Sequence, residues 1–237
     1  MKLLAVDTAL DDCAVALLHG DPAAPTLTVV GEVIGRGHAE KLMAMIMAAT
    51  AEAGVALAEI DAFAASIGPG SFTGIRVGVA AVRGFAVATG RPSLGVSSLE
   101  ALAHRARAEG VDRPILAVLD ARKDEVYAAL FAADGTPLGE PVVTAATRAA
   151  ALATEAGAVL VGPGATLLVP HAPSLIAVPR SPLRDVVAVA EIAAARLAAG
   201  APVVAPAPLY VRAPDAKPQG HFRLARLVPG GLEEGRP

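Results

Sequence analysis

Two stretches of this sequence share one pattern, and this internal repeat constrains the fold more than any other feature. Residues 7–18 read DTALDDCAVALL and residues 120–131 read DARKDEVYAALF, with four identities in the twelve aligned positions. Each stretch follows a short apolar run that is typical of a buried strand, at residues 3–6 and 115–119. The repeat predicts two copies of an α/β unit that begins with strand, turn and strand, joined between Gly110 and Pro114. The alternative is a chance match between short alanine-rich strings.

The segments around the repeat predict alternating strands and helices. Strands are expected at 3–8, 13–18, 26–34, 61–67 and 158–161, and helices at 39–53, 73–89, from 98 onward and at 186–199. From residue 213 onward, proline, glycine and charged residues dominate, which is typical of a flexible tail. We therefore expect an N-terminal lobe over 1–110, a C-terminal lobe over 111–212 and a tail over 213–237.

Composition excludes several classes of protein. A single cysteine, Cys13, excludes an intramolecular disulfide framework. A formal charge of −3, with 18% charged residues, does not fit a basic nucleic-acid binder. The mean hydropathy of +0.54 reflects alanine content, and Glu191 and Arg196 interrupt the apolar stretch 186–197. We expect a cytoplasmic protein without a signal peptide, a spanning helix or membrane contact.

Carboxylates end the first strand of each repeat. Asp7 could hold a Mg²⁺-bound water and Thr8 could donate to a phosphate oxygen, as in a two-lobed phosphotransferase, with Asp120 at the matching position. The alternative, which we favour, is that these aspartates accept hydrogen bonds from turn amides. The turn also carries Asp11 and Asp12 and no glycine, so it is a poor cradle for phosphate.

A glycine-rich loop, Gly68-Pro69-Gly70-Ser71, precedes the helix at 73–89. Its amides could bind an anion, but the loop matches neither the Walker pattern nor GxGxxG. The alternative is that Ser71 caps the helix and that the glycines permit a tight turn.

Two helices carry features of a partner interface. Gly74 and Gly78 lie one turn apart in the second helix and would let another backbone approach, unless they pack on the chain's own sheet. In the helix 39–53, an apolar stripe of Leu42 and Ile46 is joined by a second stripe of Met43 and Met47. The alternative for this helix is deep burial.

Patterns for metal binding and nucleophilic catalysis are absent from the sequence. The five histidines include no pair at i and i+4, and there is no HExxH, CxxC or G-x-S-x-G motif. We therefore expect no metal and no catalytic residue, and we interpret His38 as a cap or surface residue.

Several motifs together resemble one known family. They are the DTA opening at Asp7, the run GPGSFTGIRVG over 68–78, GVSSL over 95–99, DAR over 120–122 with EVY over 125–127, and PLYVR over 208–212. They are similar to the TsaB (YeaZ) family over residues 1–212. The run at 68–78 is far more specific than a generic glycine loop.

This resemblance implies a fold and a role. The fold would be α/β, with the two RNase-H-like lobes of the superfamily that contains actin, heat-shock chaperone ATPases and sugar kinases (ASKHA), in agreement with the repeat. The role would be that of a non-catalytic subunit in N6-threonylcarbamoyladenosine modification of tRNA next to the anticodon. Such a subunit binds and activates a TsaD-type transferase and works with a TsaE-type ATPase, and it meets tRNA through the complex. The alternatives are a small-molecule kinase or ATPase of the same superfamily and, less in keeping with the missing ligands, a metalloprotease.

The resemblance also implies which residues matter. The two metal-binding histidines of TsaD correspond to Ser98 and Leu102, which cannot replace imidazoles, and Pro163 interrupts the glycine pair expected at an adenosine. No tightly bound cofactor is expected, although ATP or ADP could bind at the complex interface, and the chain alone could form a homodimer through the Gly78 face. The expected partner interface is Leu42, Met43, Ile46, Met47, Gly74, Arg76, Gly78 and Val82. The expected vestigial nucleotide site is Asp7, Thr8, Gly70, Ser71, Asp120, Gly162 and Gly164.

Overall fold

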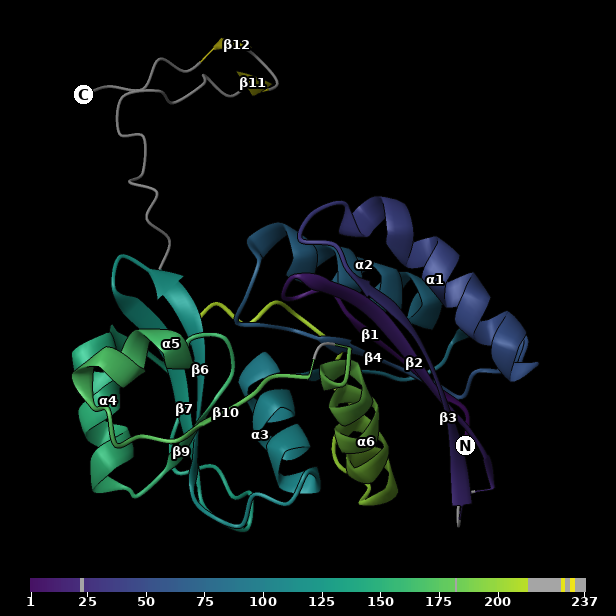
Figure 1. Ribbon diagram of the computed structural model, residues 1–237. Coiled ribbons are helices and arrows are strands. Elements are labelled where there is room, and N and C mark those ends of the chain that lie inside the picture. The colour runs from purple at the N-terminus through teal and green to yellow at the C-terminus, as the bar shows by residue number, and fades with distance from the viewer. Residues whose placement is uncertain (22–23, 182, 213–226, 229–230, 233–237) are drawn as a thin grey trace.

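The computed structural model describes residues 1–21, 24–181, 183–212, 227–228 and 231–232. Two lobes lie side by side, each built on one five-stranded sheet (Figure 1). Both sheets are buried at their centres, since every residue of Leu3–Asp7 in the first sheet and residues 115–119 in the second are buried.

The first sheet has the order β3-β2-β1-β4-β5. Its first three strands form an antiparallel meander, and β4 and β5 run parallel to β1. The strands are β1 (Leu3–Asp7), β2 (Asp12–Asp21), β3 (Ala24–Val33), β4 (Ala62–Ser66) and β5 (Ser93–Val96). The accompanying helices are α1 (His38–Ala53), the 3-10 turn η1 (Leu57–Glu59), α2 (Phe72–Thr89) and α3 (Ser98–Ala108).

The second sheet repeats this topology, in the order β8-β7-β6-β9-β10. The strands are β6 (Ile115–Arg122), β7 (Glu125–Phe131), β8 (Val142–Ala145), β9 (Val159–Val161) and β10 (Ala177–Val178). The helices are α4 (Ala146–Glu155), α5 (Ala165–Leu168), the 3-10 turn η2 (Val169–His171) and α6 (Asp185–Ala198). Three antiparallel strands followed by two parallel ones define an RNase-H-like lobe. The predicted duplication and the predicted two-lobed ASKHA-type fold are therefore confirmed.

The last helix of each lobe packs against the sheet of the other lobe. Leu99, Leu102 and Ala106 of α3 pack in one core with residues of β6, β7 and β9. Conversely, Val186 and Val189 of α6 pack in one core with residues of β1, β2 and β4. The expected boundary at 110/111 separates the two sheets, but it does not separate the helices that cover them.

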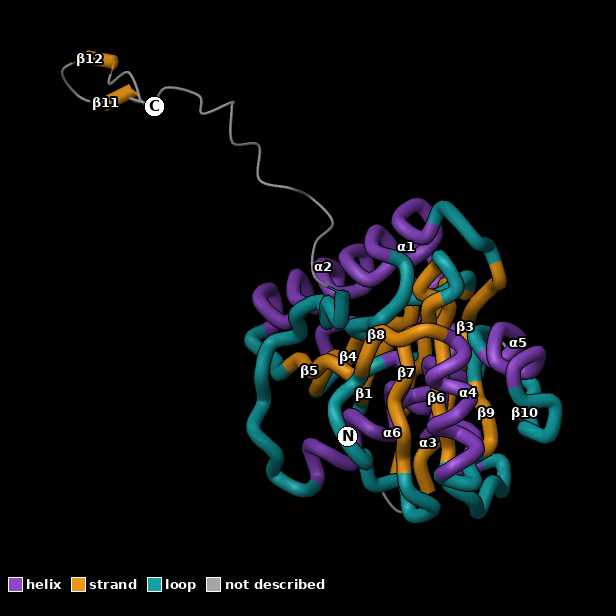
Figure 2. Tube along the Cα trace, turned by 90° about the vertical axis from the view of Figure 1, so that its left-hand side faces the viewer, coloured by secondary structure: helices purple, strands orange, loops and turns teal. Residues whose placement is uncertain are grey.

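The other face of the first sheet is covered by α1 and α2, which lie side by side on the outside of the molecule (Figure 2). The helix α1 ends at Gly54, which has a left-handed φ of 64°, as the sequence predicts. Ser71 caps α2, because its Oγ accepts a hydrogen bond from Gly74 N at 3.2 Å. The capping alternative for the glycine-rich loop is therefore confirmed.

Among the described helices, α2 alone is long and apolar enough to cross a membrane by length and composition. Its inner side, however, carries Ile75, Val79 and Val82 into the core of the first lobe. Packing against β1 and β4 accounts for its apolar character.

The tail expected over 213–237 lies mostly outside the described residues. Its described positions are β11 (Leu227–Val228) and β12 (Gly231–Leu232), which pair antiparallel and were not predicted. The strands β5, β8 and β10 and the helices α4 and α5 also had no counterpart in the sequence predictions.

Candidate functional site

A cleft of about 550 Å³ opens between the two lobes. From the first lobe it is lined by the turn after β1 and by Gly70 and Ser71. From the second lobe it is lined by Asp120, Arg122 and Tyr127, among others. The cleft lies at the ends of β1 and β6, where the two halves of the repeat face each other.

Asp7 and Thr8 lie behind the wall of this cleft. Asp7 is buried, and its Oδ1 accepts hydrogen bonds from Ser66 Oγ at 2.5 Å and from Ala9 N at 3.0 Å. Burial raises the pKa of Asp7 to about 6, with the hydrogen bonds opposing this shift. Thr8 is also buried and donates from Oγ1 to Gly74 O at 2.8 Å. Both side chains therefore form hydrogen bonds with other groups of the same chain.

Asp120 does line the cleft and is exposed. Its Oδ1 accepts a hydrogen bond from Arg122 N at 2.6 Å, within a turn where Arg122, Lys123 and Asp124 all have positive φ, at 68°, 55° and 58°. Asp120 and Asp7 therefore both accept from the amide two residues ahead, which is the turn-forming role that the sequence analysis favoured.

The glycines of the expected nucleotide site serve the chain's own packing. A Cβ at Gly70 would lie 2.2 Å from Ala9 O, and one at Gly162 would lie 2.4 Å from Val118 O. At Gly164 it would lie 2.9 Å from the backbone of Leu119. These glycines let one loop pack closely on the turn after β1 and another on β6.

The vestigial nucleotide site is therefore only partly assembled. Gly70, Ser71 and Asp120 meet in the cleft. Asp7, Thr8, Gly162 and Gly164 do not line it, and we correct the expectation for these four residues. The turn after β1 offers a phosphate no glycine and presents Asp11 to the cleft, although Gly35, Gly70, Arg122 and Arg180 also line it.

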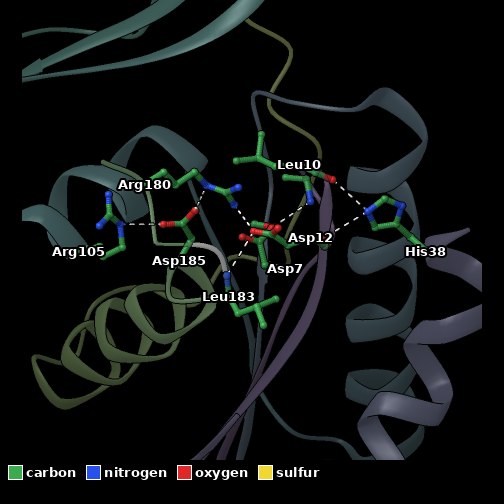
Figure 3. Close-up of polar contacts among 10 residues, drawn as sticks. Asp7, Leu10, Asp12, His38, Arg105, Arg180, Leu183 and Asp185 are labelled. Carbon is green, nitrogen blue, oxygen red and sulfur yellow. Dashed lines mark hydrogen bonds and ion pairs between the residues drawn. The ribbon is translucent and has the colours of Figure 1, made fainter. Parts of the chain in front are cut away.

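A buried ionic network lies beside the cleft and was missed by the sequence analysis (Figure 3). Arg180 pairs with Asp12 and, at 2.8 Å, with Asp185, while Arg105 Nε lies 3.1 Å from Asp185 Oδ1. Burial raises the pKa of Asp185, and the two arginines oppose this shift. The network connects β2 with α3, with α6 and with the segment before α6. Asp12 lies far from Arg180 in the sequence, and Arg105 lies far from Asp185, so no local sequence pattern reveals these contacts.

This network corrects the view of the acidic turn. Asp12 is buried and paired with Arg180, so of the two acidic residues in this turn only Asp11 lines the cleft. His38 is also buried, and its Nε2 lies 3.0 Å from Leu10 O and 3.1 Å from Asp12 O. The buried imidazole holds the turn after β1 through these contacts. The prediction that His38 is a cap or surface residue was therefore wrong.

Most of the expected partner interface is buried within this chain. Leu42, Ile46 and Val82 belong to the core of the first lobe. A Cβ at Gly74 would lie 2.0 Å from Thr8 O, and one at Gly78 would lie 2.6 Å from Thr8 Oγ1. These five residues hold α1 and α2 on their own sheet and offer no surface to a partner. The close-packing alternative is therefore the correct one for Gly74 and Gly78.

Three residues of the expected interface are exposed, namely Met43, Met47 and Arg76. The outer face of α2 adds Ala80, Gly84 and Val87, and the Val87 side chain is 87% exposed. At Gly84 a Cβ would meet nothing within 4 Å. We call Met43, Met47, Ala80, Gly84 and Val87 the outer apolar face of α1 and α2.

The PLYVR motif crosses from one lobe to the other. Leu209 N donates to Ile67 O at 2.8 Å in the first lobe, and Tyr210 OH accepts from Arg76 Nε at 3.0 Å. Two residues later Arg212 pairs with Glu125 of β7 in the second lobe. The motif therefore links the two sides of the cleft.

Comparisons with known proteins identify the family. The model of the family described as "TsaD: tRNA N6-adenosine threonylcarbamoyltransferase" matches residues 23–173. The solved structure of YeaZ from Pseudomonas aeruginosa is 35% identical, with a TM-score of 0.73, and the match covers 88% of this chain and 99% of that one. The chain belongs to the TsaB (YeaZ) family.

Two relatives show how far the likeness extends. "tRNA threonylcarbamoyladenosine biosynthesis protein TsaB" from Escherichia coli K12 is 38% identical over 135 residues, 56% of each chain, so the match spans about half the length of that relative. An uncharacterized protein of Mycobacterium tuberculosis H37Rv is 37% identical over 220 residues, covering 91% of this chain and 94% of the relative. The likeness to YeaZ and to the mycobacterial relative therefore includes both lobes.

Ser98 and Leu102 are both buried, and Leu102 lies in the core under the second sheet. Their correspondence to the metal-binding histidines of TsaD stays a prediction. Within the described part of the chain, no group of three or more His, Cys, Asp or Glu side chains could hold a metal ion.

Proposed function

We propose that this chain is a non-catalytic subunit for N6-threonylcarbamoyladenosine modification of tRNA, and that it binds and activates a TsaD-type transferase. The family relatives named for this modification support the pathway. The proposal includes a cytoplasmic location, a TsaE-type ATPase in the same complex, and tRNA that reaches the chain through that complex.

The observation that carries the proposal is Gly84. A glycine in a helix interior costs about 1 kcal/mol relative to alanine. Gly74 and Gly78 are explained by contacts with Thr8, but at Gly84 nothing of the chain lies within 4 Å of a Cβ. Gly84 has no packing reason within the chain and is exposed, as are Val87 on the same helix and Met43 and Met47 on the neighbouring helix, so it fits the close approach of a partner helix.

The first experiment tests the pathway in cells. Depleting this protein and measuring tRNA nucleosides by mass spectrometry should show loss of threonylcarbamoyladenosine. The wild-type gene should restore the modification. Normal levels after complete depletion would contradict the proposed function.

The second experiment tests the surface. In a calorimetric titration against the transferase of the same organism, Met47→Lys and Val87→Lys should each weaken binding at least tenfold, because a charge would be buried without a partner. Val142→Lys is the matched control, since Val142 is an exposed valine on the edge of the second sheet. Equal affinity of all three variants would refute the outer apolar face as the interface.

A small-molecule kinase or ATPase is the second candidate, and only the interlobe cleft favours it. Its residues lack a phosphate cradle, so we expect Mg-ATP to show neither tight binding nor turnover with the isolated chain. By resemblance, ATP or ADP would instead bind at the interface with the transferase. Turnover by the isolated chain would favour the kinase.

A further inference from the structure

A second cavity, of about 430 Å³, opens at the first turns of α1 and α2. Its lining includes His38 and Glu40 from α1 and Thr73 and Val77 from α2. Gly35 lines both this cavity and the interlobe cleft, so the two are neighbours. The volume falls within the roughly 300–1,000 Å³ of small-molecule sites. The proposed function makes no use of this cavity.

His38 presents a buried hydrogen-bond acceptor to the cavity. The residue is 7% exposed, and its Nε2 lies 3.0 Å from Leu10 O and 3.1 Å from Asp12 O. Because a carbonyl oxygen only accepts, Nε2 carries the proton, and Nδ1 of the neutral ring is left as an acceptor. Nδ1 makes no hydrogen bond with any residue that the structure describes, and Figure 3 shows it across the ring from the two carbonyls. His38 lines the cavity whereas Leu10 and Asp12 do not, so Nδ1 faces the cavity.

Backbone donors face the cavity from both helices. The first N–H groups of an α-helix have no partner within the helix. Gly37 begins α1 without a side-chain cap, and Ser71 Oγ at the start of α2 accepts only from Gly74 N. The N–H groups of Ala39 and Thr73, which line the cavity, bond to no other group in the described part of the chain. Each helix N-terminus also carries about half a positive charge, so an anionic group is favoured between them.

Two unpaired charges complete the lining. Arg36 and Glu40 are both exposed, and neither forms an ion pair with another described residue. Glu40 Oε2 lies 3.6 Å from the position of a Gly37 Cβ, beside the start of α1. The cavity therefore has donors in Arg36 and the helix amides, and acceptors in His38 Nδ1 and the Glu40 carboxylate.

We propose that this cavity binds a free α-amino acid. Its carboxylate accepts hydrogen bonds from the amides of the two helices and from Arg36, as anions do at helix N-termini. Its ammonium group donates to His38 Nδ1 and to the Glu40 carboxylate. Val77, which is partly buried, gives a small side chain an apolar contact. A simple anion leaves the two acceptors without a donor, and a simple amine leaves the amides and Arg36 without an acceptor, so a ligand that carries both groups fits best.

Nuclear magnetic resonance of the full chain tests this binding. Titration with L-alanine should give saturable shifts of the Ala39 and Thr73 amides and of the His38 ring, which are the groups that line the cavity. N-acetyl-L-alanine lacks the ammonium group and L-alaninamide lacks the carboxylate, so each should bind at least tenfold more weakly. The absence of saturable shifts, or equal affinity for all three ligands, overturns the proposal.

Arg36→Met tests the donor side with an exposed residue whose loss leaves the core intact. It should weaken L-alanine binding at least tenfold, because the charged donor to the carboxylate is removed. Lys41→Met is the matched control, since Lys41 is an exposed cation of α1 that pairs with Glu32 and does not line the cavity. Its affinity should stay within about twofold of wild type. Equal weakening by both variants overturns the assignment of the carboxylate to Arg36.

Two further variants test the acceptor side. Glu40→Gln should reduce the preference for L-alanine over N-acetyl-L-alanine, because the charge that attracts the ammonium group is lost. His38→Gln keeps an N–H donor for Leu10 O and Asp12 O but removes the Nδ1 acceptor. It should fold as wild type does and bind L-alanine at least tenfold more weakly. An unchanged ligand preference in Glu40→Gln overturns the acceptor side, whether or not the histidine variant folds.

Discussion

The two glycines Gly78 and Gly84 of α2 should respond to alanine with opposite changes in stability. At Gly84 the added methyl group meets open space, so the variant gains the helix propensity of alanine, about 1 kcal/mol. For a chain of this length that gain corresponds to a rise in Tm of about 2–4 °C.

At Gly78 the same substitution meets Thr8 Oγ1 at 2.6 Å. Thr8 is buried, and its hydroxyl is held by Gly74 O, so it has little freedom to move. Overpacking costs about 1–3 kcal/mol and the strained hydrogen bond about 0.5–1.5 kcal/mol. Against the propensity gain of about 1 kcal/mol, the net effect is a loss of about 0.5–3.5 kcal/mol.

Urea denaturation followed by circular dichroism measures both changes. Stabilisation by both substitutions would refute the contact between α2 and Thr8, and destabilisation by both would refute the exposure of Gly84. A larger residue at the exposed position separates folding from function. Gly84→Leu should be at least as stable as wild type, and it should bind the transferase at least tenfold more weakly.

Two further perturbations act on the buried charges. Arg180→Met removes the partner of two buried carboxylates, Asp12 and Asp185, and should lower the free energy of unfolding in urea by about 3–5 kcal/mol. Lys41→Met, at the exposed pair with Glu32, should lower it by less than about 1 kcal/mol. Similar losses for the two variants would refute the network. The folded-state pKa of Asp7, about 6, lies above the ordinary value of 3.8, so its contribution to stability is present below pH 3.8 and is lost as the pH rises through 6. Asp7→Asn should therefore raise stability at pH 7 by roughly 1–3 kcal/mol and flatten the profile between pH 4 and 6, and an unchanged profile would contradict the burial of a charge there.

The architecture of each lobe could be predicted from the sequence because the signals for its strands, turns and helix ends lie close to those elements in the chain. Apolar strands, the turn after Asp7 and the glycine after α1 each lie within a few residues of the element they define. The exchange of α3 and α6 and the pairing of Asp12 with Arg180 join residues far apart in the chain, so composition and periodicity carry no trace of them.

Five of the eight residues expected at the partner interface are buried within the chain, and the reason is geometric. Apolar periodicity identifies a face of a helix but does not say whether the sheet or a partner covers it. Gly74 and Gly78 share one face, whereas Gly84 lies six residues further on, about 120° around the helix from Gly78. Once Gly78 is known to face Thr8, the exposure of Gly84 follows.

The exchange of helices also bears on synthesis of the chain at the ribosome. The first sheet has all five strands once residue 96 has emerged, but one of its faces stays bare until α6, which ends at Ala198, is made. At 5–20 residues per second this interval lasts roughly 5–20 s. During that time Leu3, Ala5 and Val96 lack the α6 side chains that cover them, so we expect this apolar face to attract a ribosome-associated chaperone.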